Sequence, residues 1–308
     1  MHYKTEMNVG LAGRFAEIKA RKRDGTERLL SSGFDNLILD NGLDKATTEN
    51  PLLDTCAVGN GTSEPAVSQS SLDSFVAATS GFPTESPSAI FDEENDVYGG
   101  LNELQFSFEE GAAAGNLSEI GIGWDGADLF SRELIRDEAG NPTTITVLSD
   151  EELVVTYQLF ILVSIDPVSW GPVEIAEEDR SGFIQPGELG GSLWEEASFF
   201  RVRSGTSTND YRAAPDEPSS VQSFFSGDNA DSVSQTDPEV GDRFVEMSVT
   251  WEDSSANFTE GIKGFQWAFS GSAAGIFQCS IDPPIMKTSD DELTMTFRVN
   301  FNRGTAPE

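Results

Sequence analysis

Carboxylates are the most abundant groups in this sequence that could do chemistry. The 308 residues include 53 Asp and Glu but a single histidine, His2, at the N-terminus, where chains usually fray. This composition excludes a Ser-His-Asp or Cys-His triad and every metal site built from several histidines. Two carboxylates beside a cleft would suffice for glycoside hydrolysis, but no pair stands out among so many. We therefore predict that the protein is not an enzyme.

Two short turns each place a pair of carboxylates close together. They are Asp125-Gly126-Ala127-Asp128 and Asp228-Asn229-Ala230-Asp231. Such a turn can hold Ca²⁺ if backbone oxygens complete the coordination shell, although neither fits the twelve-residue calcium loop. Ordinary Asp-rich turns are the commoner outcome. The sequence thus predicts no cofactor, with Ca²⁺ as the alternative.

The cysteines give no sign of a metal or disulfide site. Cys56 and Cys279 are 223 positions apart and belong to no C-x-x-C pair. This spacing indicates neither a zinc site nor a disulfide framework. We expect both to be buried thiols.

The net charge restricts the classes of partner. With 19 Lys and Arg the chain carries a formal charge of −34, whereas binding to DNA, RNA or an anionic membrane needs clustered positive charge. The N-terminus lacks the apolar stretch of a signal peptide, and the most apolar segment, 153–165, is too short to cross a bilayer. We expect no nucleic-acid or membrane partner and synthesis in the cytoplasm.

The charge is unevenly divided along the chain. Residues 1–28 hold seven basic and four acidic residues, a net +3, and the other 280 hold 12 and 49, a net −37. Electrostatics would favour this basic arm, with Arg21, Lys22 and Arg23 as interface candidates, lying on the acidic body of another copy. The alternative is one exposed strand over Phe15–Arg23 with Lys and Arg on its solvent face.

The elements that must position these groups are predicted to be strands. Apolar and polar residues alternate with period two throughout, and no long helical stripe occurs. Expected strands are 15–20, 104–108, 120–124, 153–161, 244–251, 264–269 and 293–301, with a tight turn at Arg23–Thr26. One short helix is expected within 36–44, and polar loops at 80–95, 205–220 and 227–241.

Three collinear blocks recur along the chain. Residues 57–63 resemble 201–207 at an offset of 144, 104–119 resemble 245–260 at 141, and 149–157 resemble 289–297 at 140. The ordered blocks predict an internal duplication. The expected fold is therefore mainly β, with few short helices and two tandem related β-sandwich or β-barrel-like domains. Their predicted bounds are 1–165, which includes the basic arm, and 166–308.

Several short motifs in the first half point to a known family. They are Asn36-Leu37-Ile38-Leu39-Asp40-Asn41-Gly42-Leu43, then Val58-Gly59-Asn60-Gly61-Thr62, Gly115-Asn116-Leu117-Ser118-Glu119 with its extension to Trp124, and Leu129-Phe130-Ser131-Arg132. Over residues 34–160 the chain resembles virion structural proteins of tailed bacteriophages, particularly tail fibre and collar-type proteins. In these an N-x-x-x-x-x-G-L helix precedes a V-G-x-G-T strand and turn.

The resemblance implies a non-enzymatic virion component at the neck, tail, baseplate or fibre attachment. Its expected partners are other virion proteins, in a homo-oligomeric ring or fibre. Interface candidates by this resemblance are Asn36, Leu37, Gly42, Leu43, Gly59 and Gly61. The second half departs from the pattern, because it lacks the N-G-L element and has Arg203 in place of Gly59.

Two other classes of function stay open at this point. A host-surface or carbohydrate-binding adhesin could use its tryptophans as a sugar platform, although tryptophans in a β-rich fold more often belong to the core. A glycan-cleaving tailspike would need two carboxylates about 5–10 Å apart.

Overall fold

The structure is a mainly β fold, as the sequence predicts. This computed structural model describes residues 2–47, 53–80, 84–92, 97–125, 128–164, 167–175, 177–186, 211–214, 227–236, 239–268 and 276–307. Within these ranges the only helix is α1 (Asp40–Lys45), and no helix is long and apolar enough to span a membrane.

The strands fall into two groups along the chain. The first group is β1 (His2–Lys22), β2 (Glu27–Asp35), β3 (Leu37–Ile38), β4 (Thr55–Gly59), β5 (Phe75–Ser80), β6 (Thr84–Asp92), β7 (Val97–Ser107), β8 (Gly115–Leu117), β9 (Glu119–Asp125), β10 (Asp128–Leu134), β11 (Ile145–Val147) and β12 (Glu151–Ser164). The second is β13 (Val168–Ile175), β14 (Glu178–Pro186), β15 (Tyr211–Ala214), β16 (Asp228–Asn229), β17 (Ser232–Thr236), β18 (Phe244–Trp251), β19 (Ile262–Ala268), β20 (Ile276–Ile285) and β21 (Leu293–Arg303).

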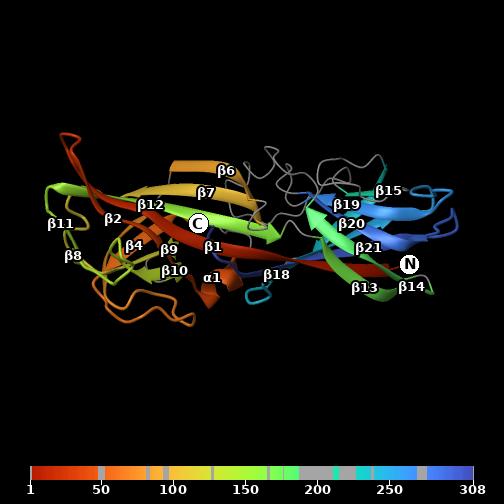
Figure 1. Ribbon diagram of the computed structural model, residues 1–308, viewed down its shortest axis with the longest axis horizontal. Helices are drawn as coiled ribbons and strands as arrows, with labels where there is room; N and C mark the ends of the chain where they lie inside the picture. Colours follow the sequence, from red (N-terminus) through yellow and green to blue (C-terminus); the bar gives the residue numbers. More distant parts are fainter. Residues whose placement is uncertain are drawn as a thin grey trace.

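The molecule is elongated and has two lobes (Figure 1). An eight-stranded sheet, in the order β17-β18-β21-β1-β12-β7-β6 with β2 also on β1, runs through both lobes. In the first lobe, at the left of Figure 1, it packs on the five-stranded sheet β3-β10-β9-β4-β5. In the second lobe it packs on the six-stranded sheet β13-β14-β20-β19-β15-β16, so each lobe is a β-sandwich. A two-stranded ribbon, β8 with β11, completes the first lobe.

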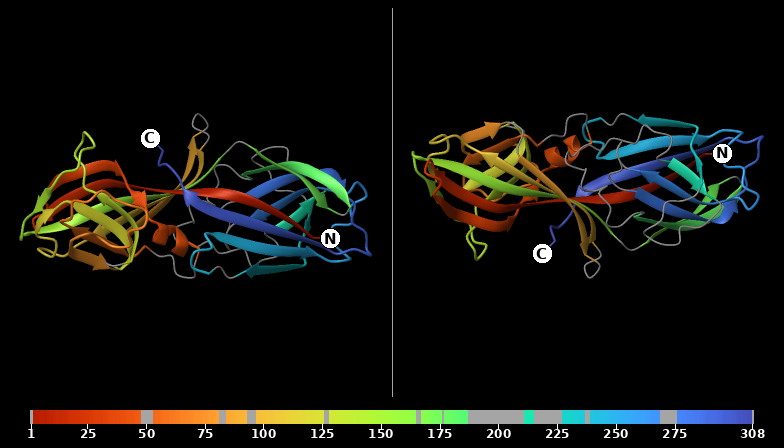
Figure 2. Two further views of the ribbon diagram at one scale, coloured as in Figure 1. Left: turned by 90° about the horizontal axis from the view of Figure 1, so that it is seen from below. Right: turned by 90° about the horizontal axis from the view of Figure 1, so that it is seen from above.

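Strand β1 joins the two lobes (Figures 1 and 2). Its first half runs parallel to β21, from His2 beside Thr294 to Leu11 beside Arg303, and its second half runs antiparallel to β12. Odd-numbered side chains, such as Met7, face the core in the first half. A β-bulge between Phe15 and Glu17 then shifts the phase, so that Ile18 and Ala20 are buried instead. One strand thereby contributes buried side chains to both lobes.

The expected turn and helix near the N-terminus are confirmed. Gly25 has a φ of 85°, and the Asp24 carboxylate accepts a 2.9 Å hydrogen bond from the Thr26 amide. Such a turn favours glycine because other residues are strained at positive φ. The helix expected within 36–44 begins later, at Asp40, since residues 37 and 38 form β3, and it ends one residue beyond that window, at Lys45.

The three predicted polar loops are wrong in part, because strands occupy much of what the structure describes of them, whereas residues 230–231 and 239–241 are not in strands. Strand β6 lies within 80–95, β15 within 205–220, and β16 and β17 within 227–241. Strands β6 and β17 are the two ends of the eight-stranded sheet. Edge strands are held by backbone pairing on one side and need no apolar alternation, which is why their polar sequences resemble loops.

The internal duplication stays a prediction. The repeated segments lie in equivalent pairs, because β7 pairs antiparallel with β12 and β18 with β21. The registers of the two pairs differ by two residues, however. If the offsets of 141 and 140 held, Ser248 would lie opposite Thr294, but it lies opposite Thr296. The repeat at 201–207 and the boundary at 165–166 lie outside the described residues. In addition, β1 contributes to both lobes rather than to the first alone.

Candidate functional site

A fully buried ion pair joins two neighbouring strands of the first lobe's five-stranded sheet. Glu119 opens β9 and Arg132 lies on the neighbouring β10, and neither side chain is exposed to solvent. The Arg132 guanidinium donates to Glu119 Oε2 from Nε at 3.0 Å and from Nη2 at 2.8 Å. Because two charges have left water together, the pair is stable only if the remaining lone pairs and protons are also satisfied.

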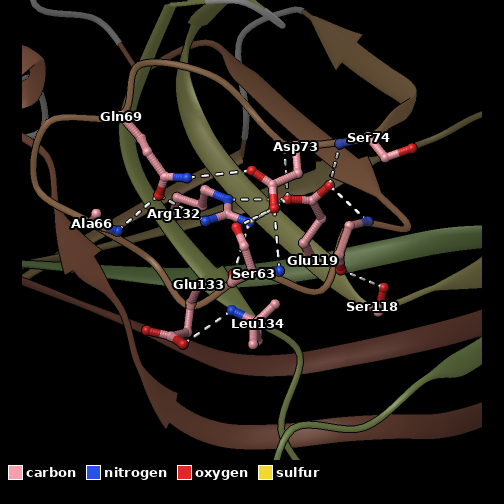
Figure 3. Close-up of polar contacts among 11 residues, drawn as sticks. Ser63, Ala66, Gln69, Asp73, Ser74, Ser118, Glu119, Arg132, Glu133 and Leu134 are labelled. Carbon is pink, nitrogen blue, oxygen red and sulfur yellow. Dashed lines mark hydrogen bonds and ion pairs between the residues drawn. The ribbon is translucent and has the colours of Figure 1, made fainter.

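The Glu119 carboxylate accepts three backbone amides from one loop. Its Oε1 accepts from Gly61 at 2.9 Å and from Ser74 at 2.8 Å, and its Oε2 accepts from Asp73 at 3.0 Å (Figure 3). The loop thus supplies amides from both of its ends. Burial of the carboxylate is compensated by these bonds together with the guanidinium.

Arg132 binds the same loop through its other nitrogens. Nη1 donates to Gln69 Oε1 at 2.8 Å, and Nη2 donates to the Ser63 carbonyl at 3.2 Å and lies 3.2 Å from Asp73 Oδ2 (Figure 3). Bonds from the Ser63 hydroxyl and the charge of Arg132 hold the pKa of Asp73 below its usual value. We call Glu119, Arg132, Asp73, Gln69 and Ser63 the clamp.

The clamp holds residues 60–74, an Ω-loop that projects from the first lobe (Figure 1). The Asn60 amide donates to the Ser74 carbonyl at 2.9 Å and closes the loop. The loop also accepts amides from the body of the lobe, from Asp40 to Val67 at 2.7 Å and from Leu129 to Ser70 at 2.9 Å. Most of its side chains nevertheless face solvent, so the clamp orders a largely exposed segment.

Two of the predicted interface residues, Gly59 and Gly61, lie against the clamp. A Cβ at Gly59 would be 2.5 Å from both Glu119 Oε1 and the Ser74 carbonyl, and one at Gly61 would overlap the same carboxylate. Glycine is needed here so that the backbone can approach Glu119. The V-G-x-G-T motif therefore has an internal role, the formation of the clamp.

The other four predicted residues near α1 also make internal contacts. Leu43 is buried, and a Cβ at Gly42 would collide with the Phe130 carbonyl. Leu37 pairs with Arg132 between β3 and β10, and the side-chain Nδ2 of Asn36 donates to the hydroxyl of Tyr157 at 3.1 Å. Burial raises the pKa of that hydroxyl to about 12. These residues fix α1 and β3 against β10, next to the clamp.

Helix α1 also connects the two lobes. Asp40 accepts from Arg303 at 2.6 Å and from Arg243 at 3.1 Å, and Asp44 forms an ion pair with Arg243. The bond from Arg303 is the main reason that the pKa of Asp40 lies below its usual value. Arg243 adopts a φ of 50°, which is uncommon for a residue other than glycine. We call these four residues the inter-lobe latch.

The basic arm is part of the sheet, as the strand alternative predicts. Arg21, Lys22 and Arg23 form ion pairs within the chain, with Glu152 at 2.8 Å, Asp150 at 3.1 Å and Glu110 at 3.4 Å respectively. Docking of this segment on another copy would have to compete with these pairs.

Three of the four carboxylates of the predicted calcium turns are engaged in hydrogen bonds, and the side chain of the fourth, Asp125, lies outside the described residues. Asp128 binds Asn41 and Lys45, Asp228 accepts the Ala256 amide, and Asp231 accepts the Glu252 amide. Residues 126 and 127 of the first turn lie outside the described residues. In the described ranges no three His, Cys, Asp or Glu side chains are grouped so that they could hold a metal ion. Calcium binding stays a prediction.

The cysteines and two of the tryptophans belong to the core. Cys56 and Cys279 are buried free thiols, as expected, and burial raises the pKa of both. Trp251 and Trp267 are almost fully buried, so they cannot form an exposed sugar platform. Trp194 lies outside the described residues.

The sequence does not predict the buried ion pair. Glu119 lies within one of the motifs that carry the family resemblance and Arg132 ends another, but their pairing across β9 and β10 could not be read from their spacing. The available signal was a single Glu and a single Arg in otherwise uncharged segments rich in apolar residues and glycine, because such charges are buried only when paired.

In comparisons with known proteins, no protein-family model, no curated protein and no solved structure matches the chain.

Proposed function

We propose that this protein is a structural component of a tailed bacteriophage particle that acts by protein–protein assembly. One observation carries the proposal. The motifs that resemble phage virion proteins are separate in sequence, yet Gly61 and Arg132, from two of them, both hydrogen-bond to Glu119, from a third. The resemblance therefore concerns residues that build one structural unit, a β-sandwich with a rigidly held loop.

The shape and charge of the molecule are consistent with this role. One strand, β1, ties two sandwiches into an elongated body (Figure 2), which suits a spacer or connector in a larger assembly. The charge of −34 favours solubility of a surface component present in many copies. We propose that the protein lies at the tail, neck, baseplate or fibre attachment and that its partners are other virion proteins.

The test is the composition of purified particles of the phage that encodes this sequence. Quantitative mass spectrometry should find the chain at a fixed number of copies per particle, and a tag fused after residue 307 should appear as extra density at a symmetric position. Absence of the chain from particles washed free of lysate would overturn the proposal. Particles that assemble and infect normally after deletion of the gene would also overturn it.

A further inference from the structure

Strand β5 is an outer strand with an unusual composition. In the described part of the chain it pairs with β4 on one side only. Its residues Phe75-Val76-Ala77-Ala78-Thr79-Ser80 carry no charge, although 23% of the chain is charged. Unpaired amides and carbonyls along an outer strand are a template for another strand, and proteins usually block it with charges or proline.

Most other outer strands of the described sheets carry such blocking residues. Strand β6 contains Glu85, Pro87 and Asp92, and β2 begins with Glu27-Arg28 and ends with Asp35. Strand β13 contains Pro172 and Glu174. The outer strand β17 is also uncharged, but it is only five residues long and none of its side chains is a large exposed apolar group. Strand β5 differs because it begins with Phe75, which is 56% exposed.

The clamp holds β5 in a fixed position. The Ser74 amide, directly before the strand, donates to Glu119 at 2.8 Å, and the Ser74 carbonyl accepts the Asn60 amide. Register with β4 runs from Ser80 beside Thr55 to Phe75 beside Gly59. Ordering this edge before any partner arrives lowers the entropy cost of binding to it.

Charge identifies a second copy as the partner that fits this edge. Two chains of −34 repel one another over most of their surfaces. Residues 65–80 contain a single charged residue, Asp73, and its carboxylate lies 3.2 Å from the buried Arg132. Each Lys and Arg whose side chain the structure describes, apart from Lys287, already forms an ion pair within the chain. These pairs involve Lys4, Arg14, Lys19, Arg21, Lys22, Arg23, Arg28, Lys45, Arg132, Arg136, Arg180, Arg243, Lys263, Arg298 and Arg303.

We propose that β5 pairs antiparallel with β5 of a second copy, so that the two five-stranded sheets form one continuous sheet across a two-fold dimer. The inference rests on the proposed function, because it names the self-contact of a particle component. Phe75 of each copy packs against the other copy beside the new strand pair. The loop of residues 60–74 lies at both ends of the contact.

Matched charge substitutions test this pairing on the full chain. Ala78 is an exposed residue of β5 and Ser234 an exposed residue of β17, so Ala78→Asp and Ser234→Asp add the same charge to the two uncharged outer strands. Sedimentation equilibrium should find that Ala78→Asp weakens the dimer about tenfold or more, because it brings two like charges into one short strand pair. Ser234→Asp should leave the dimer unchanged. Circular dichroism confirms that both variants fold.

The sign of the salt effect provides a second test. Added salt screens repulsion between the acidic bodies, so it should strengthen a dimer formed through an uncharged edge. Docking of a basic arm on an acidic body would be weakened by salt instead. Phe75→Ser should weaken the dimer, with Val240→Ser, a substitution at a 66% exposed residue of the chain, as its control.

The outcomes separate this inference from the proposed function. A wild-type chain that stays monomeric at high micromolar concentration and high salt overturns the pairing even if particles contain the protein. Dimers equally sensitive to Ala78→Asp and Ser234→Asp, or weakened by salt, overturn it too. A dimer broken by Ala78→Asp alone supports the pairing even if particles lack the chain, and then only the phage role fails.

Discussion

Among the side chains that the structure describes, each lobe buries one arginine, and the two arginines have different partners. Arg132 in the first lobe is fully buried and faces the equally buried Glu119. Arg180 in the second lobe is 3% exposed and donates mainly to carbonyls, those of Ile175, Pro283 at 3.0 Å and Pro284 at 3.3 Å. The one carboxylate that Arg180 contacts, Glu178 at 3.0 Å, belongs to a side chain that is 56% exposed.

The difference shows how a buried guanidinium can join distant segments in two ways. Arg180 ties the β13–β14 turn to β20 through neutral carbonyl oxygens, so its removal leaves acceptors without donors but no unpaired charge. Arg132 neutralises a carboxylate that has no access to water, so its removal leaves an unpaired charge in the core. The first lobe should therefore depend more strongly on its arginine than the second.

Arg132→Met should have the largest effect on stability. It leaves Glu119 charged and buried, and we expect the free energy of unfolding to fall by about 3–5 kcal/mol. Denaturant unfolding followed by tryptophan fluorescence measures the change. The double variant Arg132→Met/Glu119→Gln should recover part of the loss, since it removes the unpaired charge. A double variant less stable than the single variant would refute this explanation.

Arg180→Met should destabilise the protein less, by about 2 kcal/mol, because it leaves only hydrogen-bond acceptors without donors. The same unfolding measurement compares it directly with Arg132→Met. Equal losses for the two variants would mean that the buried carboxylate does not explain the dependence on Arg132.

Gly61→Ala tests the clamp from the side of the loop. A Cβ there overlaps the Glu119 carboxylate, so we expect a loss of about 1–2 kcal/mol and faster amide hydrogen exchange over residues 60–74. Ser68→Ala, at an exposed position of the same loop, is the control and should change stability by less than about 0.5 kcal/mol. Unchanged exchange in Gly61→Ala would show that the glycine is not needed for the clamp.

The smallest expected effect concerns the latch that joins the two lobes. The folded-state pKa of Asp40 lies below its ordinary value of 3.8, so its contribution to stability is present above that pH and is lost as the pH falls through the lower value. Asp40→Asn should therefore flatten the dependence of the unfolding midpoint on pH below 3.8. Glu138→Gln, at an exposed site, should leave this dependence unchanged. A parallel slope in Asp40→Asn and wild type would contradict the role of Asp40.

The sequence predicts the strongly alternating elements well. Strand β18 has the bounds expected from the alternation over Phe244–Trp251, and the Asp24-Gly25 turn lies where the dipeptide indicates. Both signals are local, since alternation reports which face is buried and glycine reports positive φ. Strand β6 carries no such signal because its pairing depends on β7, and the sequence therefore predicts a loop there.

The candidate site illustrates the same limit. Gly59 and Gly61 are identifiable from their motif, but their need for glycine comes from Glu119, which is 58 residues after Gly61. Asn36, Leu37, Gly42 and Leu43 are likewise recognisable as a group, yet the structure places them against β3, β10 and Tyr157. Motifs identify residues under constraint, whereas the contact that causes the constraint lies on another strand.

The sequence by itself determined the class of fold, the buried thiols and the excess of negative charge, because these follow from local periodicity and from composition. Only the tertiary structure decided that β1 belongs to two lobes, that the basic residues near the N-terminus form ion pairs within the chain, and that Glu119 meets Arg132. Each of these depends on which strands become neighbours. Strand neighbours are set by the packing of whole sheets, which no short stretch of sequence encodes.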